Sequence, residues 1–224
     1  MAKKSNKQRQ KARQRKAAKR KKRAVSRPRP QSGRSLLRAS GGWPLYECLL
    51  SKEWQKEGEI VQILVARRSR QGQIATGTFL VDLGCLGVKS AFSRTFHTLR
   101  EYRELRDGIR ERQDMIKIDD LNLVAKIIRE AIAYAKDLGF RPDPDYRDAM
   151  FVLGDADPDA CDVPVPLGGP EGKPFFIAGP YDNVDRIMAK LIRKLGPDGF
   201  HFMAPLGGGG ELFLPDEDEE DAWE

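Results

Sequence analysis

Several features that would point to a catalytic or membrane protein are missing from this sequence. Only three cysteines occur in 224 residues, and no two of them have the C-x-x-C spacing of many metal and redox sites. No run of about 18 apolar residues is present, which predicts that nothing spans a membrane. A G-x-x-x-x-G-K-[ST] motif and an apolar secretory signal are also missing. We therefore expect free thiols, a cytoplasmic location, no bound cofactor and no nucleotide-driven motor.

Acidic side chains are missing from the start of the chain, where Glu47 is the first one. Residues 1–38 carry 17 Lys and Arg, residues 39–210 carry 23 of them against 25 Asp and Glu, and residues 211–224 carry 8 acids without a base. The net charge of +7 therefore comes from the first segment. This distribution predicts three parts: a basic disordered arm and linker (1–42), a single globular α+β domain (43–206), and a glycine linker with an acidic tail (207–224).

The arm has a composition that cannot bury an apolar face. Its first 23 residues include 13 Lys and Arg, with Met1 and four alanines as the apolar members. We expect it to be disordered on its own and to bind nucleic acid, with RNA favoured, through phosphate contacts and counterion release. A solvated tail would have the same composition, as would a nuclear import signal at 19–23 in a eukaryotic cell. The candidate contacts are Lys11, Arg13, Arg15, Lys19, Arg20, Lys21, Lys22 and Arg23.

The segment around which the domain is organised is residues 59–82. Residues 60–67 and 74–82 are apolar and rich in β-branched side chains, and a polar turn at 69–72 separates them. This pattern predicts an antiparallel hairpin that is covered on both faces, with a bulge or a close backbone approach at Gly77. The arginines at the turn could contact phosphate or face solvent, and we favour solvent: Arg67, Arg68 and Arg70.

Helical periodicity or helix-start signals recur through the rest of the domain. They predict helices at about 44–54, 98–113, 121–138, 144–153 and 181–195, and Asp119 or Asp120 is the expected N-cap of the third. Residues 173–178 form a further strand candidate. A small antiparallel sheet built on the 59–82 hairpin and packed with several helices is therefore the expected α+β fold.

Asp82 ends the second strand of the hairpin beside two glycines, in a segment that also carries Cys85 and Lys89. An acid at this position could bind a metal, act as a base or cap the turn, and we favour the cap. Cys85 and His97 alone do not make a zinc site. Residues 154–172 contain aspartates at alternate positions, as in a calcium loop, but they lack the required glycine and glutamate. We therefore assign no metal site.

Three stretches together resemble one family: FLVDLGCLGVKSAF (79–92), AIAYAKDLGFRPDPDY (131–146) and GKPFFIAGPYDN (172–183). This is an uncharacterised family of mostly bacterial proteins, members of which are sometimes labelled helicase-related. The resemblance covers about residues 43–195. It implies a single module to which the arm and the tail are additions, and it implies no activity.

Two classes of function remain open. The first, which we favour, is a non-enzymatic protein that its arm positions on RNA or DNA, alone or within a ribonucleoprotein. The second is a metal-dependent nuclease or other hydrolase in which Asp82 gathers divalent ions with Asp119, Asp120 or Asp182. Against the second, the strand at 60–67 lacks the acid that a ribonuclease-H-like sheet would carry there. We also expect the acidic tail to fold back on the arm at low salt and to compete with nucleic acid.

Overall fold

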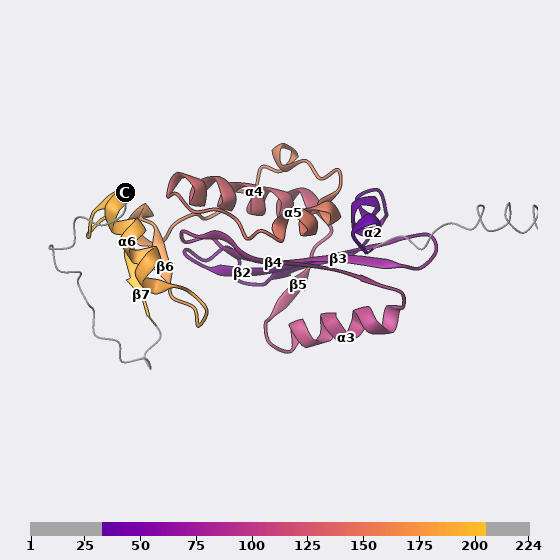
Figure 1. Ribbon diagram of the computed structural model, residues 1–224. Helices are drawn as coiled ribbons and strands as arrows, with labels where there is room; N and C mark the ends of the chain where they lie inside the picture. Colours follow the sequence, from indigo (N-terminus) through magenta and orange to yellow (C-terminus); the bar gives the residue numbers. More distant parts are fainter. Residues whose placement is uncertain (1–32, 205–224) are drawn as a thin grey trace, which may run out of the picture.

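A computed structural model describes residues 33–204 and has an α+β architecture (Figure 1). Its centre is a five-stranded antiparallel sheet with the order β4-β3-β2-β1-β5. The strands are β1 (Leu45–Ser51), β2 (Ile60–Arg68), β3 (Ile74–Asp82), β4 (Gly87–Phe96) and β5 (Met115–Lys117). The predicted fold class is confirmed.

The β2–β3 hairpin lies where the sequence predicts it. Every residue of β2 pairs with one of β3, from Ile60 opposite Asp82 to Arg68 opposite Ile74. At the turn, the backbone N–H of Ser69 donates to the Gln73 carbonyl at 2.8 Å. The predicted close approach at Gly77 is also confirmed, because an added Cβ would lie 2.8 Å from the Ala149 carbonyl oxygen.

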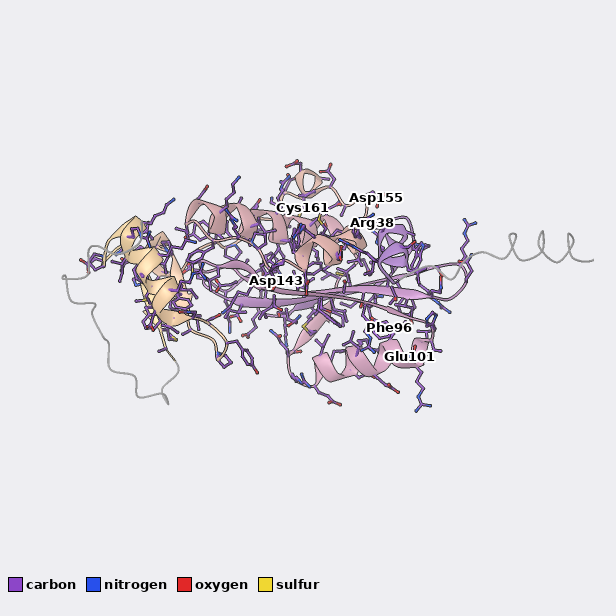
Figure 2. All side chains as sticks on the ribbon, viewed as in Figure 1. Arg38, Phe96, Glu101, Asp143, Asp155 and Cys161 are labelled. Carbon is purple, nitrogen blue, oxygen red and sulfur yellow. The ribbon has the colours of Figure 1, made fainter. Side chains whose placement is uncertain are left out.

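Helices cover the two faces of the sheet unequally (Figure 1). The larger core lies between one face and the helices α4 (Leu121–Asp137) and α5 (Tyr146–Ala149), with the 3₁₀ turn η1 (Met150–Leu153). The other face carries only α3 (Leu99–Arg110), whose Tyr102 is fully buried against Leu64, Ile74 and Phe96. Figure 2 accordingly shows Phe96 and Glu101 on the side of the sheet opposite to Arg38 and Asp155.

Side chains at the helix ends explain where α3 and α4 begin. Thr98 and Glu101 form a capping box at the start of α3, and Asp120 accepts a hydrogen bond from the Asn122 backbone N–H at the start of α4. The N-cap of α4 predicted from the sequence is therefore Asp120. Two 3₁₀ turns, η2 (Pro158–Ala160) and η3 (Pro170–Gly172), lie in the long loop that follows η1.

A small unit lies at the end of the sheet that is far from the β2–β3 turn (Figure 1). The strands β6 (Phe175–Ile177) and β7 (His201–Met203) pair in parallel, and α6 (Val184–Leu195) connects them. Its core contains Phe176 and Leu191 packed with Cys85 and Leu138. The Phe175 N–H also donates to the Gly84 carbonyl at 3.0 Å, which joins this unit to the end of β3.

The structure corrects the predicted elements at several places. Residues 44–54 were predicted to be helical, whereas β1 occupies 45–51 because it fills the sheet between β2 and β5. The strand β4 was not predicted, although it pairs along the whole of β3. Residues 33–40 were assigned to the linker, but they form the helix α2 (Gly33–Ser40), whose Leu36 and Leu37 are buried. The remaining arm, 1–32, and the tail, 205–224, lie outside the described residues.

Candidate functional site

Asp82 lies at the junction between the sheet and the small unit. Its side chain is 1% exposed, and Oδ1 accepts hydrogen bonds from the backbone N–H groups of Cys85 at 2.8 Å and Leu86 at 3.3 Å. Burial raises its pKa to about 6, and the two backbone hydrogen bonds and the nearby charge of Lys89 partly oppose that rise. The predicted capping role is confirmed by these bonds. The second carboxylate oxygen, Oδ2, is buried and has no hydrogen-bond partner among the described residues.

The next charged group along the chain forms an ion pair with the small unit. Lys89 Nζ lies 2.6 Å from Asp182 Oδ2, and the two side chains are 11% and 13% exposed. Asp182 Oδ2 also accepts the Gly179 backbone N–H at 2.7 Å. This contact joins two of the three stretches that carry the family resemblance, 79–92 and 172–183. Sequence reasoning did not find the pair, because 93 positions separate its members.

The thiol of Cys85 lies within the same junction and is fully buried. Burial raises its pKa above the usual range, and the neighbouring carboxylate of Asp82 adds to that rise. Burial likewise raises the pKa of Tyr134 on α4, to which Cys85 and Asp82 contribute. A thiol of raised pKa is a poor nucleophile, so this cluster has the properties of a structural junction.

The acids suggested as partners of Asp82 are engaged elsewhere. Asp120 caps α4, Asp182 pairs with Lys89, and the side chain of Asp119 is 93% exposed with Lys117 at 3.8 Å. Within residues 33–204, no group of three or more His, Cys, Asp or Glu side chains is placed to hold a metal ion.

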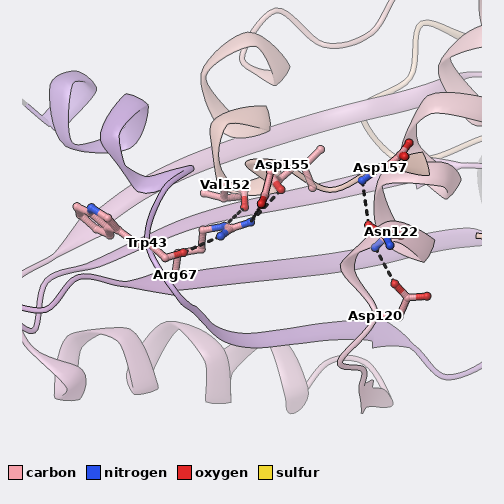
Figure 3. Close-up of polar contacts among 8 residues, drawn as sticks. Trp43, Arg67, Asp120, Asn122, Val152, Asp155 and Asp157 are labelled. Atoms are coloured by element: carbon pink, nitrogen blue, oxygen red, sulfur yellow. Dashed lines mark hydrogen bonds and ion pairs between the residues drawn. The ribbon is translucent and has the colours of Figure 1, made fainter. Parts of the chain in front are cut away.

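The aspartates of the loop 154–172 have local structural partners. Asp159 forms two hydrogen bonds with Arg129, at 2.9 and 2.7 Å, and Asp157 accepts the Asp159 N–H at 3.0 Å. The Asp157 N–H in turn donates to the side chain of Asn122 at 2.9 Å (Figure 3). This loop is therefore fixed to the first half of α4 by the same polar groups that resembled a calcium loop.

The three arginines at the hairpin turn divide into two kinds. Arg67 is 5% exposed, and its guanidinium donates to the carbonyls of Val152 at 2.5 Å, Trp43 at 2.6 Å and Leu153 at 2.9 Å (Figure 3). Burial lowers its pKa, and the charge of Asp155 opposes that effect. Neither a solvated turn nor a phosphate contact describes this residue, so the expectation for Arg67 was wrong.

Arg68 and Arg70, by contrast, are exposed, and neither forms an ion pair with any described residue. The guanidinium of Arg68 lies over the ring of Tyr46, 5.8 Å from its centroid. Two open hollows, of about 540 and 510 Å³, flank this turn and share Pro44, Ser69, Arg70 and Gln71 in their walls. We call Arg68, Arg70 and these hollows the hairpin-end surface.

The helix α2 brings the arm to this same end of the sheet. A Cβ added at Gly33 would lie 3.8 Å from Thr95 Oγ1 of β4. Thr95 is in register with Ala75 of β3 and Arg67 of β2, at the turn end of the sheet. Arg34 is fixed there by an ion pair with Asp148 at 3.1 Å, and Arg38 lies over the Phe151 ring. The candidate contacts from Lys11 to Arg23 lie outside the described residues, but the arm that carries them joins the fold beside the hairpin-end surface.

In comparisons with known proteins, no family model, curated protein or solved structure matches this chain. The resemblance stated above therefore stays a prediction. No helix within residues 33–204 is long and apolar enough to cross a membrane.

Proposed function

We propose that this protein binds the sugar-phosphate backbone of RNA or DNA through its N-terminal arm, without catalysing a reaction. The observation that carries the proposal is the separation of charge: 17 Lys and Arg with no acid in residues 1–38, beside a nearly neutral domain. Such a segment binds polyanions because it releases the counterions condensed on them.

The hairpin-end surface would add phosphate contacts on the folded domain to those of the arm. Arg68 and Arg70 are exposed and have no acidic partner among residues 33–204, and Gly33, where α2 begins, lies against β4 at the same end of the sheet. A strand of nucleic acid that follows the arm would therefore meet two further cations. RNA is the favoured partner, free or within a ribonucleoprotein, because arginine-rich segments commonly order on RNA.

The direct test measures binding of labelled 30-nucleotide RNA and DNA by fluorescence anisotropy at several salt concentrations. We expect affinity to fall steeply with salt, and deletion of 1–32 to weaken binding by about 100-fold or more, since most phosphate contacts are lost. The deletion ends before α2, so the fold is kept. Binding that is independent of salt, or that survives the deletion, would overturn the proposal.

A matched pair of double variants tests the contribution of the folded domain. Arg68→Gln with Arg70→Gln should weaken binding by about fivefold and lower the salt slope by roughly two, about one for each lost phosphate contact. Arg141→Gln with Arg186→Gln removes two exposed arginines that also lack ion pairs within the described part of the chain, but lie away from the turn. Equal effects of the two pairs would show that the hairpin end has no special role.

The hydrolase alternative has less support, because Asp82 is 1% exposed and the acids suggested as its partners are engaged elsewhere or exposed. Incubation of the protein with magnesium and labelled RNA or DNA addresses it directly. Cleavage that is lost in Asp82→Ala would favour a hydrolase over a binding protein.

A further inference from the structure

One face of the sheet has an exposed aromatic side chain at its edge. Along β4, the residues Ser90, Phe92 and Arg94 lie opposite Leu80, Thr78 and Thr76 of β3 and therefore point to one face. This is the face that α3 covers, because Phe96, two positions after Arg94, packs against Tyr102. The ring of Phe92 is nevertheless 45% exposed.

The ring is open because α3 covers only the part of this face that is near the β2–β3 turn (Figure 1). At the turn end, Tyr102 of α3 covers Leu64 and Ile74. At the other end, an added Cβ at Gly84 would lie 2.2 Å from the Phe175 carbonyl oxygen, so β6 contacts the loop that follows β3. Between them, Leu80 and Gln62 are half-buried beside the exposed Ser90.

The β3 and β4 residues that flank Phe92 on this face include a cation and no acid: Ser90, Arg94, Thr76, Thr78 and Leu80. Gln62 donates Nε2 to the Phe79 carbonyl at 3.1 Å, which leaves its side-chain oxygen as an acceptor. The hydroxyl of Thr78, directly opposite Phe92, is buried without a hydrogen-bond partner among the described residues. Arg94 lies 5.1 Å from the Phe96 ring centroid and forms no ion pair within residues 33–204.

Building on the function proposed above, we propose that this face is a single-stranded nucleic-acid site at which a base stacks on Phe92. Every base has a flat apolar face that an exposed aromatic ring can bind, and Arg94 would contact an adjoining phosphate. Gln62 and Ser90 would hydrogen-bond the edge of the base. A protein interface would need a broader apolar patch, whereas Phe92 is the one large apolar side chain exposed in this part of the sheet.

The test uses the full chain with labelled 15-nucleotide single strands of RNA and DNA and with a duplex. Phe92→Ala should weaken single-strand binding by about fivefold or more, because stacking is lost. The salt slope and duplex affinity should stay unchanged, since duplex bases are already stacked. Met150→Ala is the matched control, because Met150 is 41% exposed and lies in η1 against the opposite face.

Phe92→Trp supplies a second readout that does not depend on a loss of affinity. It should keep the affinity of the parent protein, and its added tryptophan fluorescence should be quenched when a base stacks on it. Thermal melting of each variant checks that the fold is intact, as expected for an exposed position.

The outcomes separate this inference from the proposed function. Loss of binding on deleting 1–32, together with unchanged single-strand affinity in Phe92→Ala, would overturn the stacking site and leave the arm as the binding element. Added fluorescence in Phe92→Trp that is not quenched by single strands would also overturn it. A change in sedimentation of Phe92→Ala without a change in nucleic-acid affinity would assign the face to a second copy of the chain.

Discussion

Lys89 Nζ and Asp182 Oδ2 lie 2.6 Å apart in side chains that are 11% and 13% exposed. Their contact connects the edge strand β4 to the segment before α6, and so connects the small unit to the main sheet. Charges removed from water to this extent are stable only as a pair, because each alone would carry an uncompensated desolvation cost.

Lys89→Met should therefore lower the free energy of unfolding by about 3 kcal/mol, since Asp182 is left without its partner. Hydrogen exchange should increase in residues 175–203 before it increases in β2 and β3, because the pair fixes the small unit to the sheet. Denaturant unfolding and exchange mass spectrometry measure the two effects.

The exposed pair Arg100–Glu104 on α3 is the matched control, with side chains 89% and 66% exposed. Arg100→Met should cost less than about 0.5 kcal/mol, as solvent and salt screen such a pair. A double-mutant cycle of Lys89→Met with Asp182→Asn measures the coupling. A coupling near zero would mean that the contact does not hold the unit in place.

The pKa of Asp82 predicts a pH dependence of stability. Its value of about 6 in the fold exceeds the ordinary value of 3.8, so the folded protein binds more protons than the unfolded chain between these pH values. The contribution of Asp82 to the free energy of unfolding is fully present below about pH 4 and is lost as the pH rises through 6. The whole contribution is about 3 kcal/mol.

Asp82→Asn removes that titration and keeps an oxygen that can accept from the N–H groups of Cys85 and Leu86. The difference in unfolding free energy, parent minus variant, should fall by about 2.5 kcal/mol from pH 4 to pH 7. Urea unfolding across this range measures it, and other carboxylates cancel in the difference. A difference that does not change with pH would contradict the raised pKa. Asp82→Ala, which lacks the acceptor, should be destabilised at both pH values.

The buried contacts of Arg67 predict that its replacement destabilises the fold, whereas replacement of its neighbour Arg68 does not. Arg67→Ala should lower the free energy of unfolding by about 3 kcal/mol or more, because three buried carbonyls lose a charged donor. Arg68→Ala, whose side chain is exposed, should change it by less than about 0.5 kcal/mol. Thermal or urea unfolding compares the two, and similar losses would mean that the carbonyl contacts contribute little.

The fold was predictable where one local signal was sufficient. The hairpin strands are apolar on both faces, and Asp120 and Gly139 mark the ends of α4, where the positive φ of Gly139, 86°, suits glycine. The capping role of Asp82 followed from the same kind of local chemistry, since its bonds reach only to residues 85 and 86.

Elements set by distant partners were not predictable from local pattern. The strand β1 has Leu45, Leu49 and Leu50 at helix-like spacing, and only pairing with β2 and β5 makes it a strand. Between Leu80 and Val81, the register of β3 with β4 shifts, so the apolar alternation of β4 is broken. The burial of Arg67 and the pair of Lys89 with Asp182 depend on residues more than 80 positions away.

The acidic tail gives a prediction about the strength of binding. Residues 211–224 carry 8 acids and no base, whereas residues 1–38 carry 17 bases, so the tail can act as a polyanion that competes for the arm. Deleting 211–224 should tighten nucleic-acid binding by about fivefold or more at low salt, because the arm is no longer partly neutralised by its own chain. The gain should shrink toward zero near 0.5 M salt, where the Debye length falls to about 4 Å and the intramolecular attraction is screened.

A variant with every acid of 216–224 replaced by Asn or Gln is the control, since it keeps the length of the tail and should bind as tightly as the deletion. Unchanged affinity in both variants would mean that the tail does not contact the arm.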